Sequence, residues 1–595
     1  MTDTDLHVLQ SLLWPEPGIS TERDLYVRLE GAVALSMTGQ RLHFGAGGAA
    51  RFDTAANLFN LGKWQRNCGL SDLRLRLEGR GRFELVVIQA PARRSRERLV
   101  NEVVELEPGW PLSLDLSALL LHEPRSVVYF TLLALGEGEL TGAAWETAQP
   151  PKHLPQLALS ITTFRREAAV EASVARFESF MAQSPLAPFL HLFVVDNGRS
   201  AEIRPSAHVT PIGNENLGGS GGFARGLLAA EDRGATHCLF MDDDASIHMG
   251  ALERTWAFLA HADDPRTAVA GGLTMANHRW AIWESGAIFR QNCKPQWLGT
   301  DLRDSGEVLQ MEQESTGPKP HDFYGGWWYF AFPVAHAKYR PFPFFVRGDD
   351  VSFSIANDFD IVTLPGVVCF QDADFSDKES LQSLYLDLRS HLVHHLALPD
   401  MDIGRAATLK IPAWFFLRSM MQCHYETLEA LNLAIEDVLS GPDFFAANAD
   451  MADRRATLGQ IRKAEAWHPL QEAPPLSRRR FDPRQNRIWR MVMKYSLNGH
   501  LLPFFGLWGN HVTLDSGQRG QLHEVWGAAR ITYISSDGEQ SFTVRHSKRA
   551  AMRQGLRMLR NGLRLSRSYV AQKQQWRTGY EQLASTSFWK GRLGL

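Results

Sequence analysis

Three consecutive aspartates interrupt the apolar stretch "HCLFMDDDASI" at residues 237–247. Burying like charges side by side is costly unless a positive charge accompanies them. In an extended segment Asp242 and Asp244 point the same way, and at the end of a strand such a pair can hold Mg²⁺ or Mn²⁺ through oxygen ligands. A helix cap would need only one of them. We therefore expect a metal site that neutralises a diphosphate.

A second acidic pair, Asp349 and Asp350, ends the apolar run of "PFFVRGDDVSFS" (343–354). Adjacent carboxylates raise at least one pKa, and a carboxylate with a raised pKa is suited to take a proton from a hydroxyl nucleophile. The alternative is a solvated loop in which Arg347 is the partner of the pair.

Glycines dominate "NENLGGSGGFARG" (214–226), where Gly219, Gly221 and Ala224 fit the dinucleotide-binding pattern G-x-G-x-x-A. This is the third strand–helix unit of its region rather than the first, and an aspartate triplet exceeds what a ribose hydroxyl requires. Glycines that let a helix pack close to a sheet are an equal alternative.

Two adjacent tryptophans, Trp327 and Trp328, stand in "HDFYGGWWYFAFP" (321–333). Core packing is the commoner fate of tryptophan. Two neighbours in an extended segment cannot both face one core, so we expect at least one ring to be exposed and able to stack on a sugar.

The elements that position these residues differ along the chain. Residues 1–155 alternate apolar and charged side chains, as in "DLRLRLEGRGRFELVV" (72–87), and predict a β-sandwich of jelly-roll type. Residues 156–400 alternate strands with helices expected at 167–182, 221–233 and 249–261, which predicts a mostly parallel sheet. Ligands of such sheets lie beyond the carboxyl ends of the strands, where both "FVVDNG" and "LFMDDD" place aspartates.

Residues 401–595 have mainly helical periodicity. Within 548–577 an apolar stripe lies beside a basic stripe, formed by Met552, Leu556, Leu559 and Leu563 and by Arg549, Arg553, Arg557, Arg560, Arg564 and Arg567. This segment is either a solvated helix face or a helix that lies on an anionic membrane surface.

The overall composition excludes several classes of protein. Sixty-three basic and 66 acidic residues nearly balance, which argues against binding of nucleic acid by the whole chain. We expect no membrane span, because the longest apolar runs fall far short of roughly 20 residues, and no secretory signal at the start of the sequence. The five cysteines form no CxxC pair, which suits reduced thiols in a cytoplasm.

The order of the motifs identifies a resemblance. They are T-T-F-R-R (162–166), V-D-N-G (195–198), N-L-G-G-S-G-G-F (216–223), M-D-D-D (241–244), G-W-W (326–328), G-D-D (348–350) and L-P-G (364–366). In this order and spacing the chain resembles family 2 glycosyltransferases of the GT-A fold. More narrowly, it is similar to the bacterial polymerising galactofuranosyltransferases that build cell-wall galactan, which also have an N-terminal β-sandwich and a helical C-terminal region.

The resemblance implies an inverting transfer of galactofuranose from UDP-galactofuranose to a growing, lipid-linked glycan. It implies an enzyme that is cytoplasmic and peripheral on the inner face of the membrane, and relatives of this kind assemble as homo-oligomers. Nucleotide-sugar binding would fall to Phe164, Arg166, Asp196, Asn216, Gly219 and Asp243. Asp242 and Asp244 would hold Mn²⁺ or Mg²⁺, Asp350 beside Asp349 would be the catalytic base, and Trp327, Trp328 and Glu284 would contact the acceptor.

One position departs from the family pattern. A metal-binding histidine is expected six residues after the proline of L-P-G, where this chain has Gln371. An amide oxygen is a weaker ligand for Mn²⁺ than imidazole. Either Gln371, Asp372 or Asp374 replaces the histidine, or metal affinity is reduced, or the chain is a catalytically weakened relative. We favour an active enzyme with an altered metal shell.

Three other functions stay open at this point. The donor can be another nucleotide sugar, such as a rhamnosyl or hexopyranosyl donor, because a change of sugar alters contacts rather than motifs. An NAD-binding oxidoreductase that uses the glycine-rich loop is an alternative from another class, and it predicts binding of NAD(H). The glutamine at position 371 keeps a non-catalytic glycan-binding relative open as a third alternative.

Overall fold

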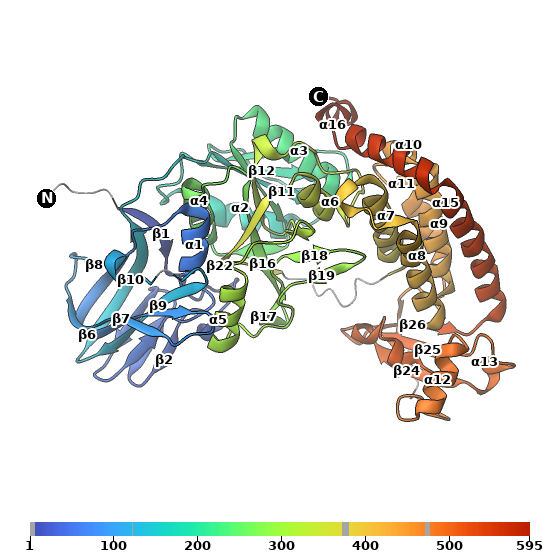
Figure 1. Ribbon diagram of the computed structural model, residues 1–595, viewed down its shortest axis with the longest axis horizontal. Coiled ribbons are helices and arrows are strands. Elements are labelled where there is room, and N and C mark those ends of the chain that lie inside the picture. Colours follow the sequence, from blue (N-terminus) through green and yellow to red (C-terminus); the bar gives the residue numbers. More distant parts are fainter. Residues whose placement is uncertain (1–5, 122, 372–379, 471–475) are drawn as a thin grey trace. The chain divides into compact units, whose positions relative to one another are not determined.

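The computed structural model describes residues 6–121, 123–371, 380–470 and 476–595, which form two compact units (Figure 1). The first unit comprises Met1–Asn216, Gly222–Lys338 and Phe353–Ala373. The second comprises Leu217–Gly221, Tyr339–Ser352 and Asp374–Leu595. The three domains predicted from the sequence, with boundaries at 155 and 400, stay a prediction.

Within its described residues, the first unit begins with strands that hydrogen-bond into one ten-stranded sheet. They are β1 (His7–Ser11), β2 (Arg28–Glu30), β3 (Val33–Ser36), β4 (Arg41–Phe44), β5 (Ala49–Arg51), β6 (Arg74–Pro91), β7 (Glu97–Leu106), β8 (Leu112–Asp115), β9 (Ser126–Ala134) and β10 (Gly138–Thr147). The long strand β6 pairs with β8 and β10 along its first part and with β7 and β9 along its second. One strand therefore joins two groups of strands. The jelly-roll sandwich stays a prediction.

The rest of the first unit is built on a second, nine-stranded sheet, counted over the described residues. Its order is β13-β12-β11-β14-β21-β16-β22-β15, with β17 beside β16. The strands are β11 (Leu157–Thr163), β12 (Leu190–Asp196), β13 (Val209–Gly213), β14 (His237–Asp242), β15 (Ala245–Ile247), β16 (Thr267–Met275), β17 (His278–Glu284), β21 (Phe330–Pro333) and β22 (Asp360–Gln371). The first four in the order pair in parallel, whereas β15, β17 and β21 are antiparallel to their neighbours.

Three helices lie close to where the periodicity predicts them: α2 (Glu167–Met181), α3 (Gly218–Asp232) and α4 (Gly250–His261). The helices α1 (Leu61–Cys68), α5 (Ser305–Glu314) and α6 (Asp349–Ala356) were not predicted, and α6 has residues in both units. A small sheet contains β18 (Ala287–Phe289), β19 (Cys293–Pro295) and β20 (Phe323–Tyr324). The observed α2 and α4 differ from the predicted ranges by one residue at one end. Helix α3 begins three residues earlier than predicted, because its first turn is made of glycines that carry no helical signal.

Two glycines of α3 lie against the neighbouring strand β11. A Cβ atom on Gly222 would lie 2.2 Å from Cγ2 of Thr162, and one on Gly226 would lie 1.8 Å from Oγ of Ser160. No larger residue fits at either position without movement of the helix. These contacts favour the packing interpretation of the glycine-rich segment over a dinucleotide loop.

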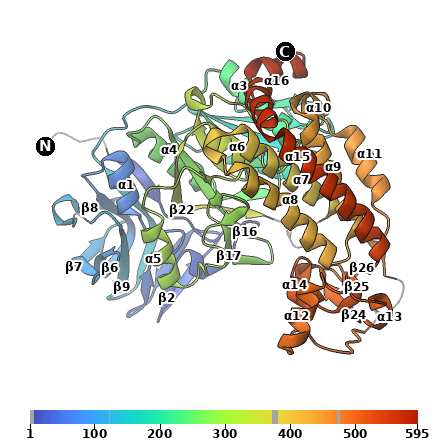
Figure 2. The ribbon, with the colours of Figure 1, turned by 45° about the vertical axis from the view of Figure 1, so that its right-hand side comes forward.

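The second unit consists of helices and one small sheet (Figure 2). The helices are α7 (Leu381–Ala397), α8 (Gly404–Met421), α9 (Tyr425–Ser440), α10 (Pro442–Ala447), α11 (Ala452–Ile461), α12 (Arg487–Tyr495), α13 (Phe505–Trp508), α14 (Leu522–Val525), α15 (Lys548–Leu583) and α16 (Thr586–Leu593). The sheet has the order β23-β26-β25-β24, with bounds His468–Pro469, Gln540–Arg545, Ala528–Ile534 and Asn510–Asp515. Its strands interrupt a region for which the sequence predicted mainly helices.

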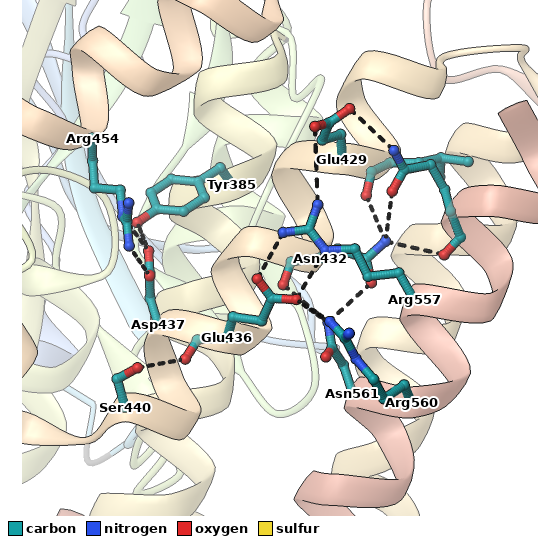
Figure 3. A network of polar contacts seen from close by, with 12 residues as sticks. Tyr385, Glu429, Asn432, Glu436, Asp437, Ser440, Arg454, Arg557, Arg560 and Asn561 are labelled. Atoms are coloured by element: carbon teal, nitrogen blue, oxygen red, sulfur yellow. Dashed lines mark hydrogen bonds and ion pairs between the residues drawn. The ribbon is translucent and has the colours of Figure 1, made fainter.

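The basic stripe predicted along 548–577 lies on α15, but part of it contacts α9. Arg557 donates to Glu436 at 2.7 and 2.9 Å, and Arg560 donates to the same carboxylate at 3.1 Å (Figure 3). The hydrogen bonds from Arg557 lower the pKa of Glu436 to about 2. These two arginines therefore serve helix packing, which corrects the expectation that the whole stripe faces an outside surface.

The apolar stripe of α15 is exposed. Met552, Leu556, Leu559 and Leu563 are 65, 62, 61 and 49% exposed. Among the helices that the structure describes, none combines the length and the apolarity that a membrane span requires.

Candidate active site

Three parallel strands end at the same edge of the nine-stranded sheet. Thr163, the last residue of β11, is in register with Asp196 at the end of β12. On the other side of β11, Thr162 is in register with Asp242 at the end of β14. Buried, mostly apolar residues precede each of these ends, so the strands bury their length and present polar groups only where the sheet stops. This edge is where ligands of such sheets bind.

The aspartate triplet turns rather than continuing as a strand. Asp243 and Asp244 form a turn between β14 and β15, so the argument that alternate side chains of an extended segment point the same way does not apply here. The turn allows β15 to pair with β22, with Ala245 opposite Gln371. The expectation of an extended Asp-x-Asp pair was wrong because a strand returns directly after the triplet.

Arg166 supplies positive charge to this acidic turn. Its guanidinium group lies 2.5 Å from Asp244 Oδ2 and 3.3 Å from Asp243 Oδ1. Thr163 Oγ1 donates to Asp243 Oδ2 at 2.8 Å. Burial raises the pKa of Asp243, which the arginine and the threonine oppose because both favour the charged carboxylate.

Gln371 completes this cluster from the end of β22. Its side chain is 4% exposed, and Nε2 donates to Asp244 Oδ2 at 3.1 Å. Its other atom, Oε1, is buried and has no hydrogen-bond partner among the described residues. A buried amide oxygen without a donor is a costly arrangement, and a bound cation would satisfy it.

The oxygen atoms at the turn fit Mg²⁺ or Mn²⁺ in chemical type, since carboxylate and amide oxygens are the ligands that these ions prefer. Asp242, Asp244 and Gln371 would supply them. Across the described residues, no group of three or more His, Cys, Asp and Glu side chains lies close enough together to hold a metal ion. Asp372 and Asp374, the other candidate ligands, lie outside the described residues.

Asp196 is used by its own loop. Its carboxylate accepts backbone N–H groups from Gly198, Ser200 and Ala201 at 2.7, 2.6 and 2.8 Å. It is 7% exposed. The aspartate therefore shapes the loop after β12, a role that the sequence analysis did not assign to it.

The other predicted nucleotide contacts lie in segments that follow strands. Phe164 directly follows β11 and is 40% exposed, with the Arg165 guanidinium 5.2 Å from its ring centroid. Asn216 is half-buried in the loop between β13 and α3, and Gly219 lies in the first turn of α3.

The acidic pair Asp349 and Asp350 opens helix α6 in the second unit. Ser220 Oγ donates to Asp349 Oδ2 at 2.8 Å, and Asp350 Oδ1 accepts the N–H of Val351 at 2.8 Å. Burial raises the pKa of both carboxyls, and the charge of Asp350 raises that of Asp349 further. The hydrogen bond from Ser220 acts in the opposite direction. Two neighbouring carboxyls with raised pKa values are suited to general-base work near neutral pH.

The loop before this pair is held in an unusual conformation. Arg347 and Gly348 have φ angles of 68° and 92°, a region that residues other than glycine rarely adopt. His394 lies 2.9 Å from the carbonyl oxygen of Gly348 through Nε2, and Arg347 pairs with Asp387 at 3.2 Å. Sequence reasoning missed His394 and Ser220, because neither stands near the G-D-D motif in the chain.

The tryptophans are placed differently from expectation. Trp327 is 5% exposed, and its ring packs against Phe223, Phe240 and Phe353 at centroid distances of 5.0, 5.1 and 5.7 Å. A ring in the core presents no face to a sugar, so the predicted acceptor contact of Trp327 is corrected. Trp328 is half-buried and donates from Nε1 to the carbonyl of Gly271 at 2.9 Å.

The last predicted acceptor residue, Glu284, ends β17 and is 5% exposed. It is in register with Leu273 of β16. Its carboxylate therefore lies in the same unit as the acidic turn.

Comparison with known proteins gives only distant structural likenesses. Neither family models nor curated proteins gave a match to the sequence. Among solved structures, the chain is similar to a mannosyltransferase from Pyrobaculum calidifontis in complex with GDP-Man and Mn²⁺, with 17% identity, a TM-score of 0.28, and 53% of this chain and 86% of that chain covered. It is also similar to glucosyl-3-phosphoglycerate synthase from Mycobacterium tuberculosis, with 14% identity, a TM-score of 0.25, and coverages of 40% and 79%. At these scores the interpretation of the site depends on its own geometry.

Proposed function

We propose that the chain is an inverting, metal-dependent glycosyltransferase that moves galactofuranose from UDP-galactofuranose to a growing, lipid-linked glycan. The observation that carries the proposal is the acidic turn, where Asp244 contacts Arg166 and Gln371 at the carboxyl edge of a parallel sheet. Carboxylates balanced by a guanidinium and an amide suit a ligand that brings both a cation and a diphosphate. The order of the sequence motifs supports the choice of family and of donor.

In this proposal each group has one role. Phe164, Asn216 and Gly219 contact the nucleotide, while Asp196 holds the loop beside it. Arg166 hydrogen-bonds the diphosphate. A bound Mn²⁺ or Mg²⁺ would add positive charge to the leaving group. Asp242, Asp244 and Gln371 would be its ligands.

The acceptor is activated by the acidic pair. Asp350 accepts the proton of the acceptor hydroxyl while the hydroxyl oxygen attacks the anomeric carbon from the side opposite the diphosphate. The bond to the diphosphate oxygen breaks as the new glycosidic bond forms, so the anomeric configuration inverts. Asp349, hydrogen-bonded to Ser220, positions its neighbour, and Trp328 with Glu284 is assigned to the acceptor sugar.

Release of UDP from a panel of UDP- and dTDP-sugars, with a short galactofuranose acceptor, tests the proposal. Each donor is measured with Mn²⁺, with Mg²⁺ and with EDTA. We expect metal-dependent release from UDP-galactofuranose alone. Release from another donor would keep the mechanism and change the substrate. If no donor is turned over while the glycan still binds, the chain is a non-catalytic relative, and NADH binding by fluorescence titration would instead favour the oxidoreductase.

We further propose that the enzyme is peripheral on the inner face of the cell membrane, in the cytoplasm, and that it assembles as a homo-oligomer as its relatives do. The exposed apolar stripe of α15 supports the membrane contact. Arg549, Arg564 and Arg567 flank it, are exposed, and make no ion pair among the described residues. Apolar side chains beside arginines match an anionic bilayer, where each basic residue contributes about 1 kcal/mol.

Replacing Leu556, Leu559 and Leu563 together by glutamine is expected to weaken binding to phosphatidylglycerol vesicles by about a hundredfold, because each leucine loses apolar burial in the lipid. Co-sedimentation measures the bound fraction. The control is Val103→Gln, which changes an apolar residue that is 53% exposed on β7. Equal binding by the triple variant and the unchanged chain would exclude α15 as the contact surface.

A further inference from the structure

The N-terminal ten-stranded sheet has a groove that is distant in sequence from the aspartate triplet (242–244) and from the pair Asp349 and Asp350. Its volume is about 310 Å³, and it is lined by residues 78–80 and 107–111 together with Glu139 and Thr141. This volume is within the range of small-molecule sites.

The groove opens where strand β6 changes partners. On one side, β6 pairs with β8 up to Leu77 and with β7 from Gly81 onward. Residues 78–80 lie between these two ladders, and the loop from β7 to β8 passes beside them. Neither β7 nor β8 pairs with β6 at these residues. The gap between the two strands leaves a space that a ligand can occupy.

At Gly79 the paired strand β10 approaches too closely for a side chain. A Cβ atom on Gly79 would lie 2.0 Å from the carbonyl oxygen of Glu139. Directly opposite, the register of β10 shifts between Leu140 and Gly142, which makes exposed Thr141 the extra residue of a β-bulge. A bulge turns a side chain toward a site that a regular strand would not reach.

One wall is a rigid turn that presents an aromatic ring. The N–H of Trp110 donates to the carbonyl of Glu107 at 3.0 Å, and Gly109 between them has a φ of 79°. Proline followed by glycine with positive φ is the arrangement of a type II turn, so this turn is stiff. Trp110 is 77% exposed, although a ring of this size is usually buried.

The polar groups of the groove are fixed and mixed in charge. Glu139 contacts Arg41 at 2.9 Å and Arg80 at 3.2 Å, and Glu78 pairs with Arg76. Among the lining residues themselves, the three carboxylates of Glu78, Glu107 and Glu139 outnumber the single guanidinium group of Arg80. Such a lining repels phosphates and anionic lipids, and it offers both donors and acceptors to a neutral ligand rich in hydroxyls.

We propose that this groove is a saccharide-binding site, in which a sugar ring stacks on Trp110 while its hydroxyls hydrogen-bond to Glu78, Arg80, Glu107 and Thr141. The site is separate from the acceptor contacts proposed above. It extends the proposed function, on which it rests for the identity of the glycan, by holding a distant part of the growing chain. An enzyme with such a site extends long acceptors better than short ones.

Calorimetric titration of the full chain tests the groove without donor or metal. The probes are a galactofuranose tetrasaccharide, mannotetraose and cellotetraose. We expect Trp110→Ala to weaken binding of the preferred tetrasaccharide by about tenfold, and Glu107→Gln to weaken it less. The matched control is Trp414→Ala, on α8, because this tryptophan is also exposed (58%). Unchanged thermal unfolding would show that the variants fold.

Each outcome decides the matter. Loss of binding in Trp110→Ala with none in Trp414→Ala supports the groove, whichever glycan binds and whether or not UDP-galactofuranose is a donor. No binding of any tetrasaccharide, or equal binding by both variants, overturns it. The UDP-release assay on the same preparations tests the proposed function separately, because it measures turnover rather than binding of the glycan. In that assay Trp110→Ala is expected to raise KM for long acceptors, while kcat at saturating acceptor stays the same.

Discussion

Asp350→Asn is expected to lower kcat for glycosyl transfer by about a thousandfold, the range in which a general base contributes. The amide keeps the shape of the side chain and cannot accept the proton of the acceptor hydroxyl. Binding of UDP is expected to change little, because the pair belongs to a different set of contacts from the acidic turn. Single-turnover kinetics with UDP-galactofuranose, beside equilibrium titration with UDP, separates the two effects.

The dependence on pH follows from the same pair. A base must be deprotonated to act, and burial raises the pKa of Asp350 and Asp349 above the ordinary range of aspartate. Activity should therefore fall as pH decreases through these raised values, at a higher pH than an exposed aspartate would show. In Ser220→Ala the hydrogen bond that lowers the pKa of Asp349 is lost, so Asp349 keeps its proton to a higher pH. Because a neutral neighbour favours the charged form of Asp350, the acidic limb set by Asp350 should not move to higher pH in this variant. An acidic limb of the unchanged chain at the pH of an exposed aspartate would exclude Asp350 as the base.

Asp244→Asn is expected to lower Mn²⁺ affinity and kcat/KM on the order of a hundredfold. The substitution removes the charge that Arg166 and Gln371 share. Titration of Mn²⁺ by electron paramagnetic resonance gives the affinity without turnover, and UDP release gives the activity.

A surface aspartate provides the control for this variant. Asp358→Asn alters a side chain that is 80% exposed and pairs with Arg266 at 2.7 Å, and it should leave both readings unchanged because exposed ion pairs contribute little. Normal Mn²⁺ binding by Asp244→Asn would assign the metal to other ligands.

The sequence predicted where β12 and β14 end and the positions of α2, α3 and α4, because hydrophobic periodicity is local. The apolar runs before Asp196 and Asp242 become buried strands that stop at those residues, and α2 and α4 lie within a residue of their predicted bounds. The apolar pattern within each of these segments is enough to predict the strand or helix, without knowledge of any contact to a distant part of the chain.

Long-range contacts decide what the sequence could not show. The turn at Asp243 depends on β15 pairing with β22, more than a hundred residues away, and the burial of Trp327 depends on rings from three separate segments. Ser220 reaches Asp349 across 129 positions. The spacing of residues within each segment does not predict any of these contacts.

If Gln371 is a metal ligand as proposed, its amide has a consequence for the pH range in which the metal would bind. A histidine at a metal site must lose its proton to bind, so protons compete with the metal around pH 6 to 7. An amide has no proton to lose in that range. In the proposed site, cation binding at this turn would therefore change little on mild acidification, and the proposed base Asp350 would set the acidic limit of activity.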